Sequence, residues 1–459
     1  GGIPGPDTIE DVGFFAEHKL DYPAPSCGDD LCLHGLYGAM GNMINGANCS
    51  LIQIGMNTPL DASTFDRPPM HLVLSVDVSG SMQGEPIQYL RAGLVEMINH
   101  LEPTDLVSLV KYSSDARVVL EAVSASNVNE IQQAFESLAA AGSTNLYEGL
   151  FTAYELASTH FDPTHQNRVI FLSDGMATAG LESEAKLRSL AEGYAKQGIA
   201  LTTIGVGADF DVDVMRGLGE VGAGNFYFLE DPKAVLEVFS DEVETFLWPI
   251  ALDARIAVSV GSAYTLRAAY GTTRWQSYGA GGFVNIPSLY LAGRTSSEEP
   301  IKEGRRGGGG AILLELVPKS GLTGEEPVEM GSVNIQWRHP LSGNLTNQTV
   351  DIVPPFGPDS LPAEGYFSHA TVEKGFVMLN IYAAFKIATE LAADSDPRTA
   401  QRTLGALRPN LADWLATHPD PDIQDDLKYV DLFIHNLDAA IANTPVYEPA
   451  DPPDPWPAD

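Results

Sequence analysis

Residues 70–247 alternate between apolar runs and amphipathic stretches. The run Met70–Asp77 is almost continuously apolar and ends in an acid, which is typical of a central parallel strand buried on both faces. Runs of the same kind predict strands at 105–112, 117–122, 168–173, 200–206 and 225–229. Apolar positions at helical spacing predict helices at 86–101, 127–140, 146–158, 182–197, 212–219 and 232–246. The alternation predicts one doubly wound, Rossmann-like α/β domain.

The chain before and after this domain has a different pattern. Residues 1–69 are irregular but contain two strand-like runs, at 18–22 and 50–56. Residues 248–360 contain short strands separated by glycine-rich turns, which is typical of an antiparallel β module. The two early runs are too short to have a core of their own. We therefore expect them to complete this module, as a β-sandwich.

The C-terminal region is predicted to be helical. Residues 361–445 show the helical spacing of apolar positions, with helices expected at 367–393, 397–418 and 422–443. Residues 446–459 are rich in proline and aspartate and are expected to form an untethered acidic tail. No apolar run reaches the ~18 residues that a membrane helix needs, so the sequence predicts no transmembrane segment.

Oxygen-bearing side chains gather where the predicted strands of the α/β domain end. The first strand runs directly into Asp77-Val78-Ser79-Gly80-Ser81, which places one carboxylate and two hydroxyls on a single loop. The strand at 168–173 is followed by Asp174, and Thr144 lies just before a predicted helix. Ligands bind at the carboxyl ends of strands in such sheets, and Mg²⁺ prefers oxygen ligands in octahedral geometry. The alternative is that the serines only cap the following helix.

These residues resemble the metal-ion-dependent adhesion site of the von Willebrand factor A domain. The motif is present as DVSGSM from Asp77, GSTN around Thr144 and LSDG with Asp174, in the family's order and at its intervals. The resemblance implies that Ser79, Ser81 and Thr144 give hydroxyl ligands to Mg²⁺, or to Mn²⁺ or Ca²⁺. It implies that Asp77 and Asp174 bind the ion directly or through water, and that an acidic side chain of a partner protein completes its shell.

A looser likeness extends beyond the α/β domain. Residues 66–69, 25–27 and 51–55 resemble segments that precede the domain in bacterial secreted proteins of this family. Residues 286–293 are similar to the loop that follows it in those proteins and in inter-alpha-trypsin inhibitor heavy chains. The insertion at 28–48 departs from this pattern, and the C-terminal helices resemble nothing specific.

The three cysteines, Cys27, Cys32 and Cys49, all lie close together near the N-terminus. This clustering predicts a local disulfide with one thiol left over, and hence an oxidising, extracytoplasmic compartment, which we expect to be bacterial. The spacing does not fix the pairing. A zinc site is an alternative, with His34 as the nearby fourth ligand, and three free thiols are another.

The charge balance is strongly acidic. Sixty-one acidic residues against 26 basic residues give a formal net charge of −35, which disfavours nucleic acid and anionic membranes as partners. A protein adapted to a salty environment is the simpler interpretation, because salt screens a dense acidic surface. A specific cationic partner is the alternative.

Other candidate sites have a simpler explanation. The chain has no GxSxG, HExxH or GxxxxGK[ST] motif, so no enzyme activity is predicted. His160 and His165 are interpreted as a solvated helix end rather than a metal pair. The acidic runs 394–396 and 420–426 could hold Ca²⁺, but helix N-terminal acids are the more common explanation.

The sequence thus predicts a monomeric, metal-dependent protein-binding or adhesion protein. An assembly factor or co-chaperone that acts with an AAA+ ATPase is the main alternative, since some proteins with this domain work inside cells. A hydrolase with an unrecognised site is a third. An acidic partner would be repelled by a chain of charge −35 unless the local surface or the ambient salt intervenes.

Overall fold

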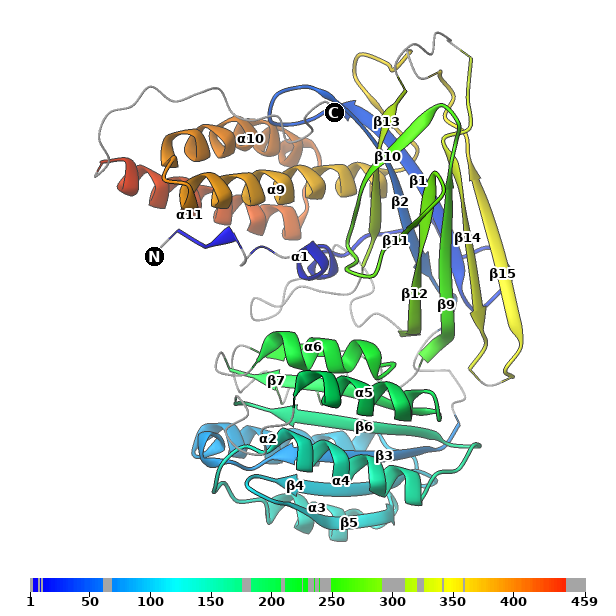
Figure 1. The fold of residues 1–459 in the computed structure, drawn as a ribbon, viewed down its shortest axis with the longest axis vertical. Coiled ribbons are helices and arrows are strands. Elements are labelled where there is room, and N and C mark those ends of the chain that lie inside the picture. The colour runs from blue at the N-terminus through cyan, green and yellow to red at the C-terminus, as the bar shows by residue number, and fades with distance from the viewer. Residues whose placement is uncertain are drawn as a thin grey trace.

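The fold was analysed in a computed structural model. It describes residues 3–6, 9, 11–60, 68–175, 183–207, 211–224, 226–229, 235, 239, 249–290, 310–319, 326–340, 342–357 and 360–442. Figure 1 shows an α/β domain below, a pair of β-sheets above it and a layer of helices beside the sheets. The fold class predicted from the sequence is confirmed.

Six strands form the central sheet of the α/β domain, in the order β5-β4-β3-β6-β7-β8. Each neighbouring pair is parallel except β4 and β5, which are antiparallel. The strands are β3 (Met70–Asp77), β4 (Leu106–Tyr112), β5 (Ala116–Ser124), β6 (Gln166–Ser173), β7 (Ile199–Val206) and β8 (Phe226–Leu229).

Helices cover both faces of this sheet, because alternate residues of the buried strands face opposite sides. Leu72, Leu74 and Val76 of β3 pack into one core with α2 and α3, whereas Val73 packs into a second core with α4, α5 and α6. The helices are α2 (Glu85–Met97), α3 (Val128–Glu136), α4 (Leu146–Thr159), α5 (Glu184–Ala195) and α6 (Val212–Val221), with short 3₁₀ turns at Gly80–Met82 and Ile98–His100.

The β module is a sandwich of two five-stranded sheets, ordered β10-β13-β2-β1-β16 and β11-β12-β9-β14-β15. Apolar residues of both sheets, such as Ile52 and Leu314 on one and Ile256 and Val333 on the other, form the core between them. The strands are β1 (Cys32–Gly41), β2 (Asn48–Asn57), β9 (Pro249–Val260), β10 (Tyr264–Tyr270), β11 (Gln276–Tyr278), β12 (Gly281–Tyr290), β13 (Ile312–Pro318), β14 (Gly331–Arg338), β15 (Leu345–Ile352) and β16 (Tyr366–Phe367).

Four helices pack against the first of these sheets. Leu51 and Leu313 on its outer face share a core with α1 (Asp11–Glu17), α9 (Ala370–Ala393), α10 (Pro397–Thr417) and α11 (Pro421–Ala442). Helix α9 is long and apolar enough to cross a membrane by length and composition, which the sequence reading did not recognise. More than half of its most apolar window is buried in this core, as in the central helix of a soluble domain.

One predicted strand is wrong. Residues 18–22 form no strand, and α1 ends immediately before them. The ring of His18 is held between the carbonyl oxygen of Phe14 and the carboxylate of Asp426, at 2.7 Å from each. The backbone N–H of Lys19 donates to Asp422. These contacts attach His18 and Lys19 to α11. Tyr22 contacts the strands through its side chain: its hydroxyl accepts from Gln53 of β2 at 3.1 Å, and its ring stacks on His34 of β1.

Two predicted segments lie mostly or wholly outside the described residues. They are the body of the helix at 232–246 and the tail at 446–459. Val235 and Phe239 are described, and both lie in the core that contains α2 and α3.

Candidate metal centre

The loop that follows β3 presents Asp77, Ser79 and Ser81 at the carboxyl end of the central sheet. The N–H of Ser79 donates to Oδ1 of Asp77 at 2.8 Å, so the loop turns back on its own carboxylate. Asp77 and Ser79 are buried, whereas Ser81 is exposed. The loop therefore holds one buried carboxylate beside a hydroxyl that solvent can reach.

Backbone hydrogen bonds tie this loop to the segment that carries Thr144. The N–H of Gly80 donates to the carbonyl of Gly142 at 3.0 Å, and the N–H of Ala141 donates to the carbonyl of Val78 at 2.7 Å. Gly142 has a φ of +92°, a conformation that glycine adopts without strain. Asn145 caps α4 by accepting from the N–H of Glu148, so Thr144 is held just before the helix begins.

The third segment follows β6 and carries Asp174. Ser81 Oγ donates to Asp174 Oδ1 at 2.8 Å, and the hydroxyls of Ser79 and Ser81 lie 2.9 Å apart. The position of a Cβ atom built on Gly175 would lie 3.4 Å from Ser81 Oγ and 3.5 Å from Thr144 Oγ1. The hydroxyls of both loops thus face the backbone that follows β6. The structure brings the five predicted residues together at one edge of the sheet.

The donor atoms of this cluster fit a hard divalent cation. Neighbouring ligands of an octahedral Mg²⁺ with bonds of about 2.1 Å are about 3.0 Å apart, which is close to the two oxygen–oxygen separations above. The cluster offers two carboxylates and three hydroxyls, and no described Lys, Arg or His side chain forms an ion pair with Asp77. Burial raises the pKa of Asp77, and hydrogen bonds from Ser79 and Ser173 partly oppose this shift.

The capping alternative does not fit the local geometry. The N-cap residue of α2 is Gly84, which lies beyond both serines and has no side chain. Ser79 precedes the 3₁₀ turn at Gly80–Met82 but makes no side-chain cap hydrogen bond there. The two hydroxyls instead face each other and Asp174.

Ser173 is a residue of the cluster that the sequence reasoning missed. It ends β6, is fully buried and donates from Oγ to Oδ2 of Asp77 at 2.8 Å. Asp77 Oδ1 accepts from Ser79 N–H, so both of its oxygens are held in place. The signal for Ser173 in the sequence was only its position before Asp174, because nothing local indicates a contact with β3.

The other predicted sites are placed as follows. Cys27 and Cys32 form a disulfide, and Cys49 is a free, buried thiol whose pKa burial raises well above its usual value. His34 contacts Asn57 instead of a cysteine. The described part of the chain contains no cluster of three or more His, Cys, Asp or Glu side chains that could hold a metal ion. The cluster at Asp77 differs from such a group because it combines two carboxylates with three hydroxyls.

The acidic runs and the histidine pair have structural partners. Asp396 caps α10 by accepting from the N–H of Thr399. Asp422 and Asp420 both pair with the buried Lys374, at 2.9 and 2.7 Å. His160 pairs with Glu121 on β5. These contacts favour the structural interpretation of all three segments.

Comparison with known proteins identifies the α/β region. Residues 71–241 match the family model of the von Willebrand factor type A domain. The chain is similar to the uncharacterized protein YfbK of Escherichia coli, with 29% identity over 44% of this chain and 36% of that protein. It is also similar to inter-alpha-trypsin inhibitor heavy chain H2 of Sus scrofa, with 24% identity over 40% of this chain and 21% of that protein. The chain thus spans well under half the length of these relatives.

A solved structure extends the likeness to the other modules. The von Willebrand factor type A protein from Catenulispora acidiphila superposes with a TM-score of 0.57, covering 90% of this chain and 91% of its own. The sequence identity is 15%, so the likeness concerns the fold alone.

Proposed function

Residues 71–241 form a von Willebrand factor type A domain, and on this premise we propose that the chain binds another protein through a divalent metal. Domains of this type commonly bind such an ion at their adhesion site, and some of their proteins act in adhesion. The observation that carries the proposal is the convergence of three loops at the carboxyl edge of the sheet, where Ser81 Oγ donates to Asp174.

Each residue of the cluster has a role in this proposal. Ser79, Ser81 and Thr144 offer hydroxyl oxygens, and Asp77 and Asp174 offer carboxylate oxygens to the ion, with Mg²⁺ as the expected metal. Ser79 N–H and Ser173 Oγ fix the orientation of Asp77. When bound, the ion supplies a positive centre that an Asp or Glu of a partner can ligate. Exposure of Ser81 leaves this side of the cluster open to such a side chain.

The wider setting follows from the same reasoning. The Cys27–Cys32 disulfide supports an oxidising compartment, so we place the protein outside the cytoplasm of a bacterium. We propose a binding role rather than catalysis, because the cluster contains hydroxyls and carboxylates but neither His nor Cys.

Metal titration of matched variants tests the metal site. Calorimetry with Mg²⁺ and Mn²⁺ on the whole chain should show binding that Asp77→Ala abolishes. Ser173→Ala should weaken it by about tenfold, the usual effect of removing a group that orients a ligand. Asp213→Ala, an exposed acid on α6 of the same domain, serves as the control and should bind like the wild type. Equal affinity in the wild type and Asp77→Ala would falsify the proposal.

Partner binding needs its own experiment. Wild-type and Asp77→Ala proteins are immobilised and exposed to an envelope extract of the source organism, with Mg²⁺ or with EDTA. A partner that is retained only by the wild type and only with Mg²⁺ supports the proposal. A partner retained equally under all four conditions contradicts it.

A further inference from the structure

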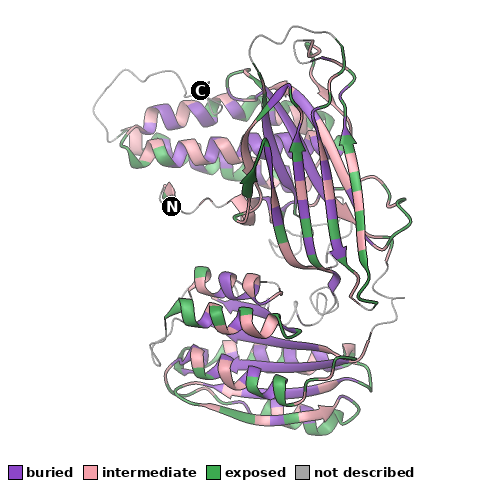
Figure 2. Cartoon of the chain, turned by 45° about the vertical axis from the view of Figure 1, so that its right-hand side comes forward, coloured by how far each residue is buried: buried purple, intermediate pink, exposed green. Residues whose placement is uncertain are grey.

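The outer face of the second sheet of the β module is polar and open to solvent. Figure 2 shows the alternation of buried and exposed positions along these strands. The residues that alternate with the core positions are mostly amides, hydroxyls and aromatic rings. Examples are Gln276, Phe283, Asn285, Asn334, Gln336 and Thr349. We call this surface the polar face.

The polar face carries few charges, and they balance in sign, with Arg255 and Arg338 against Asp253 and Asp351, although the chain as a whole has a formal charge of −35. Arg338 lies 3.5 Å from Asp253 of the same sheet. The guanidinium of Arg255 lies over the ring of Phe283, 4.1 Å from its centroid. A surface of this kind neither attracts nor repels ions strongly. It is suited to an uncharged ligand that hydrogen-bonds.

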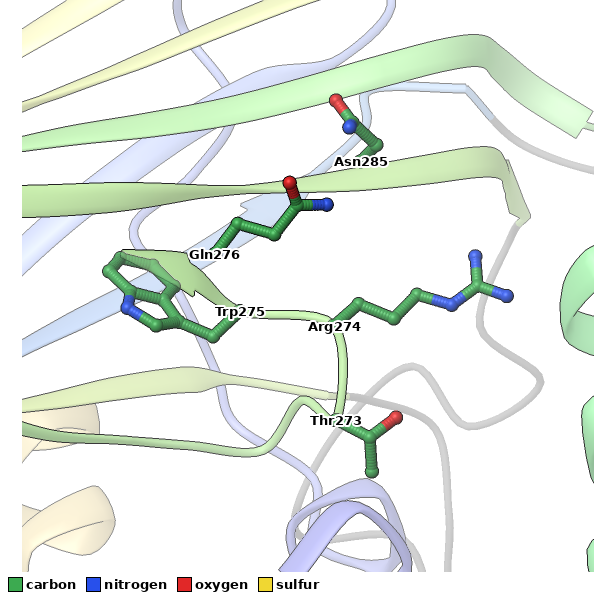
Figure 3. A pocket seen from close by; sticks show the side chains of 5 residues that line it. All are labelled: Thr273, Arg274, Trp275, Gln276 and Asn285. Atoms are coloured by element: carbon green, nitrogen blue, oxygen red, sulfur yellow. The ribbon is translucent and has the colours of Figure 1, made fainter. Parts of the chain in front are cut away.

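A shallow cavity of about 360 Å³, widely open to solvent, lies at one edge of the polar face. It is lined by Thr273, Arg274, Trp275, Gln276 and Asn285. Figure 3 shows the polar ends of Thr273, Arg274, Gln276 and Asn285 around the open space, with the indole of Trp275 on the side away from Arg274.

Two amide groups of this cavity are free to bind a ligand. Of the described residues, none forms a hydrogen bond with the side-chain amide of Gln276 or of Asn285. An amide both donates and accepts hydrogen bonds. The guanidinium of Arg274 already pairs with Glu220 of the α/β domain, at 3.4 Å, so the cavity contains no unpaired charge.

An exposed aromatic ring stands next to the cavity. The side chain of Tyr278 is 79% exposed, and it shares the face of β11 with Gln276 because the two are separated by one residue. A large exposed ring gains by packing against an apolar surface while its hydroxyl stays in water.

We propose that the cavity and the polar face bind a neutral glycan chain. Sugar rings present neighbouring hydroxyls that both donate and accept, which matches the unpaired amides of Gln276 and Asn285. They also present C–H faces that can pack on the ring of Tyr278. The polar face continues from β11 across four more strands, which gives room for a chain of several sugar units.

Oligosaccharide binding tests this proposal directly. Cellotetraose, chitotetraose and maltotetraose are added at millimolar concentration to the full chain, and binding is followed by ligand-observed NMR. At least one should bind, and the double variant Gln276→Ala/Asn285→Ala should lower its affinity by about tenfold, the effect of losing two hydrogen-bonding groups. Tyr278→Ala should also weaken binding. Gln197→Ala, a surface amide on the α/β domain, should not.

The outcomes separate this site from the metal centre. Glycan binding should persist in EDTA and in Asp77→Ala, so the glycan proposal is tested independently of the metal-dependent function. The proposal is overturned if none of the three oligosaccharides binds, or if the double variant binds as well as the wild type. Stronger binding of polygalacturonate than of the neutral probes overturns the assignment to neutral glycans, because an acidic chain would then be recognised through charge.

Discussion

His71 is a buried histidine at the start of β3, at the opposite end of the strand from Asp77. Its Nε2 contacts Ser108 Oγ at 2.9 Å, and its Nδ1 has no hydrogen-bond partner among the described residues. Burial, together with the smaller effects of the nearby His160 and His165, lowers the pKa of His71 to about 4. The folded protein therefore keeps His71 neutral at pH values where the unfolded chain is protonated.

The stability of the folded protein should decrease as the pH is lowered, because of this residue. In the unfolded chain His71 takes up its proton near pH 6.5, and in the folded protein near pH 4. The contribution of His71 to the free energy of unfolding is therefore fully present above pH 6.5 and is lost as the pH falls toward 4. The shift corresponds to about 3 kcal/mol in the free energy of unfolding. Denaturant unfolding between pH 7 and pH 4.5 should show a shallower pH dependence for His71→Gln than for the wild type. His435→Gln, on the exposed side of α11, should keep the wild-type slope; identical slopes in all three proteins would contradict this assignment.

At the scale of single residues, the gathering of the five candidate ligands at one edge of the sheet could be predicted because its signals are local. Asp77 and Asp174 directly follow or end apolar strands, and parallel strands present their carboxyl ends at one edge. Ser173 and His71 were missed because their roles depend on contacts between distant segments. The pairing of Cys27 with Cys32 was left open for the same reason, since three neighbouring cysteines allow several pairings.

At the scale of elements, α4 packs unusually close to the central sheet at Gly149. A Cβ atom on Gly149 would lie 2.5 Å from the ring of Tyr112 on β4, closer than real contacts allow. Ser75 Oγ on β3 donates to the carbonyl of Gly149 at 3.0 Å. The glycine therefore lets the helix rest directly on two strands, next to the loop that carries Thr144.

Gly149→Ala should destabilise the domain. The added methyl group must push α4 away from the buried ring of Tyr112, at a cost of about 1–3 kcal/mol in the free energy of unfolding. Gly193→Ala on α5 is the matched control, because a Cβ atom there meets nothing within 4 Å. That change should stabilise by about 0.5–1 kcal/mol through helix propensity. Urea denaturation of both variants checks the pair; a neutral or stabilising Gly149→Ala would show that the helix can shift freely.

The elements that the sequence predicted well were those with buried, periodic patterns. The strands of the central sheet and the three C-terminal helices have such patterns, and all of those within the described residues are present. Strand β1 was missed because Gly35, Gly38 and Gly41 interrupt its apolar pattern; Gly38 in turn gives room to the ring of Phe367. Residues 18–22 gave the opposite error, because His18 and Lys19 are hydrogen-bonded to α11 and Tyr22 contacts β2 through its side chain only.

At the scale of the whole molecule, the α/β domain and the β module are joined by a buried arginine. Arg168 on β6 is 1% exposed and donates from Nη2 to the hydroxyl of Tyr290, at the end of β12. Its guanidinium also lies 4.9 Å from the centroid of that ring, and Nη1 donates to Thr202. The hydroxyl of Tyr290 in turn donates a hydrogen bond to the carbonyl oxygen of Ala223 at 2.7 Å. One tyrosine of the β module thus satisfies two groups of the α/β domain.

Removing this hydroxyl should loosen the connection between the two modules. Tyr290→Phe keeps the ring over Arg168 but leaves a buried guanidinium with one partner fewer, which should cost about 2 kcal/mol. Because the lost bonds cross between modules, calorimetry should show the α/β domain and the β module unfolding further apart in temperature than in the wild type. Tyr278→Phe, which changes a tyrosine exposed to solvent, should leave the thermogram unchanged. If Tyr290→Phe lowers neither the stability nor the coupling of the two transitions, the arginine is satisfied without the β module, and the two modules are held together elsewhere, as by the Arg274–Glu220 ion pair.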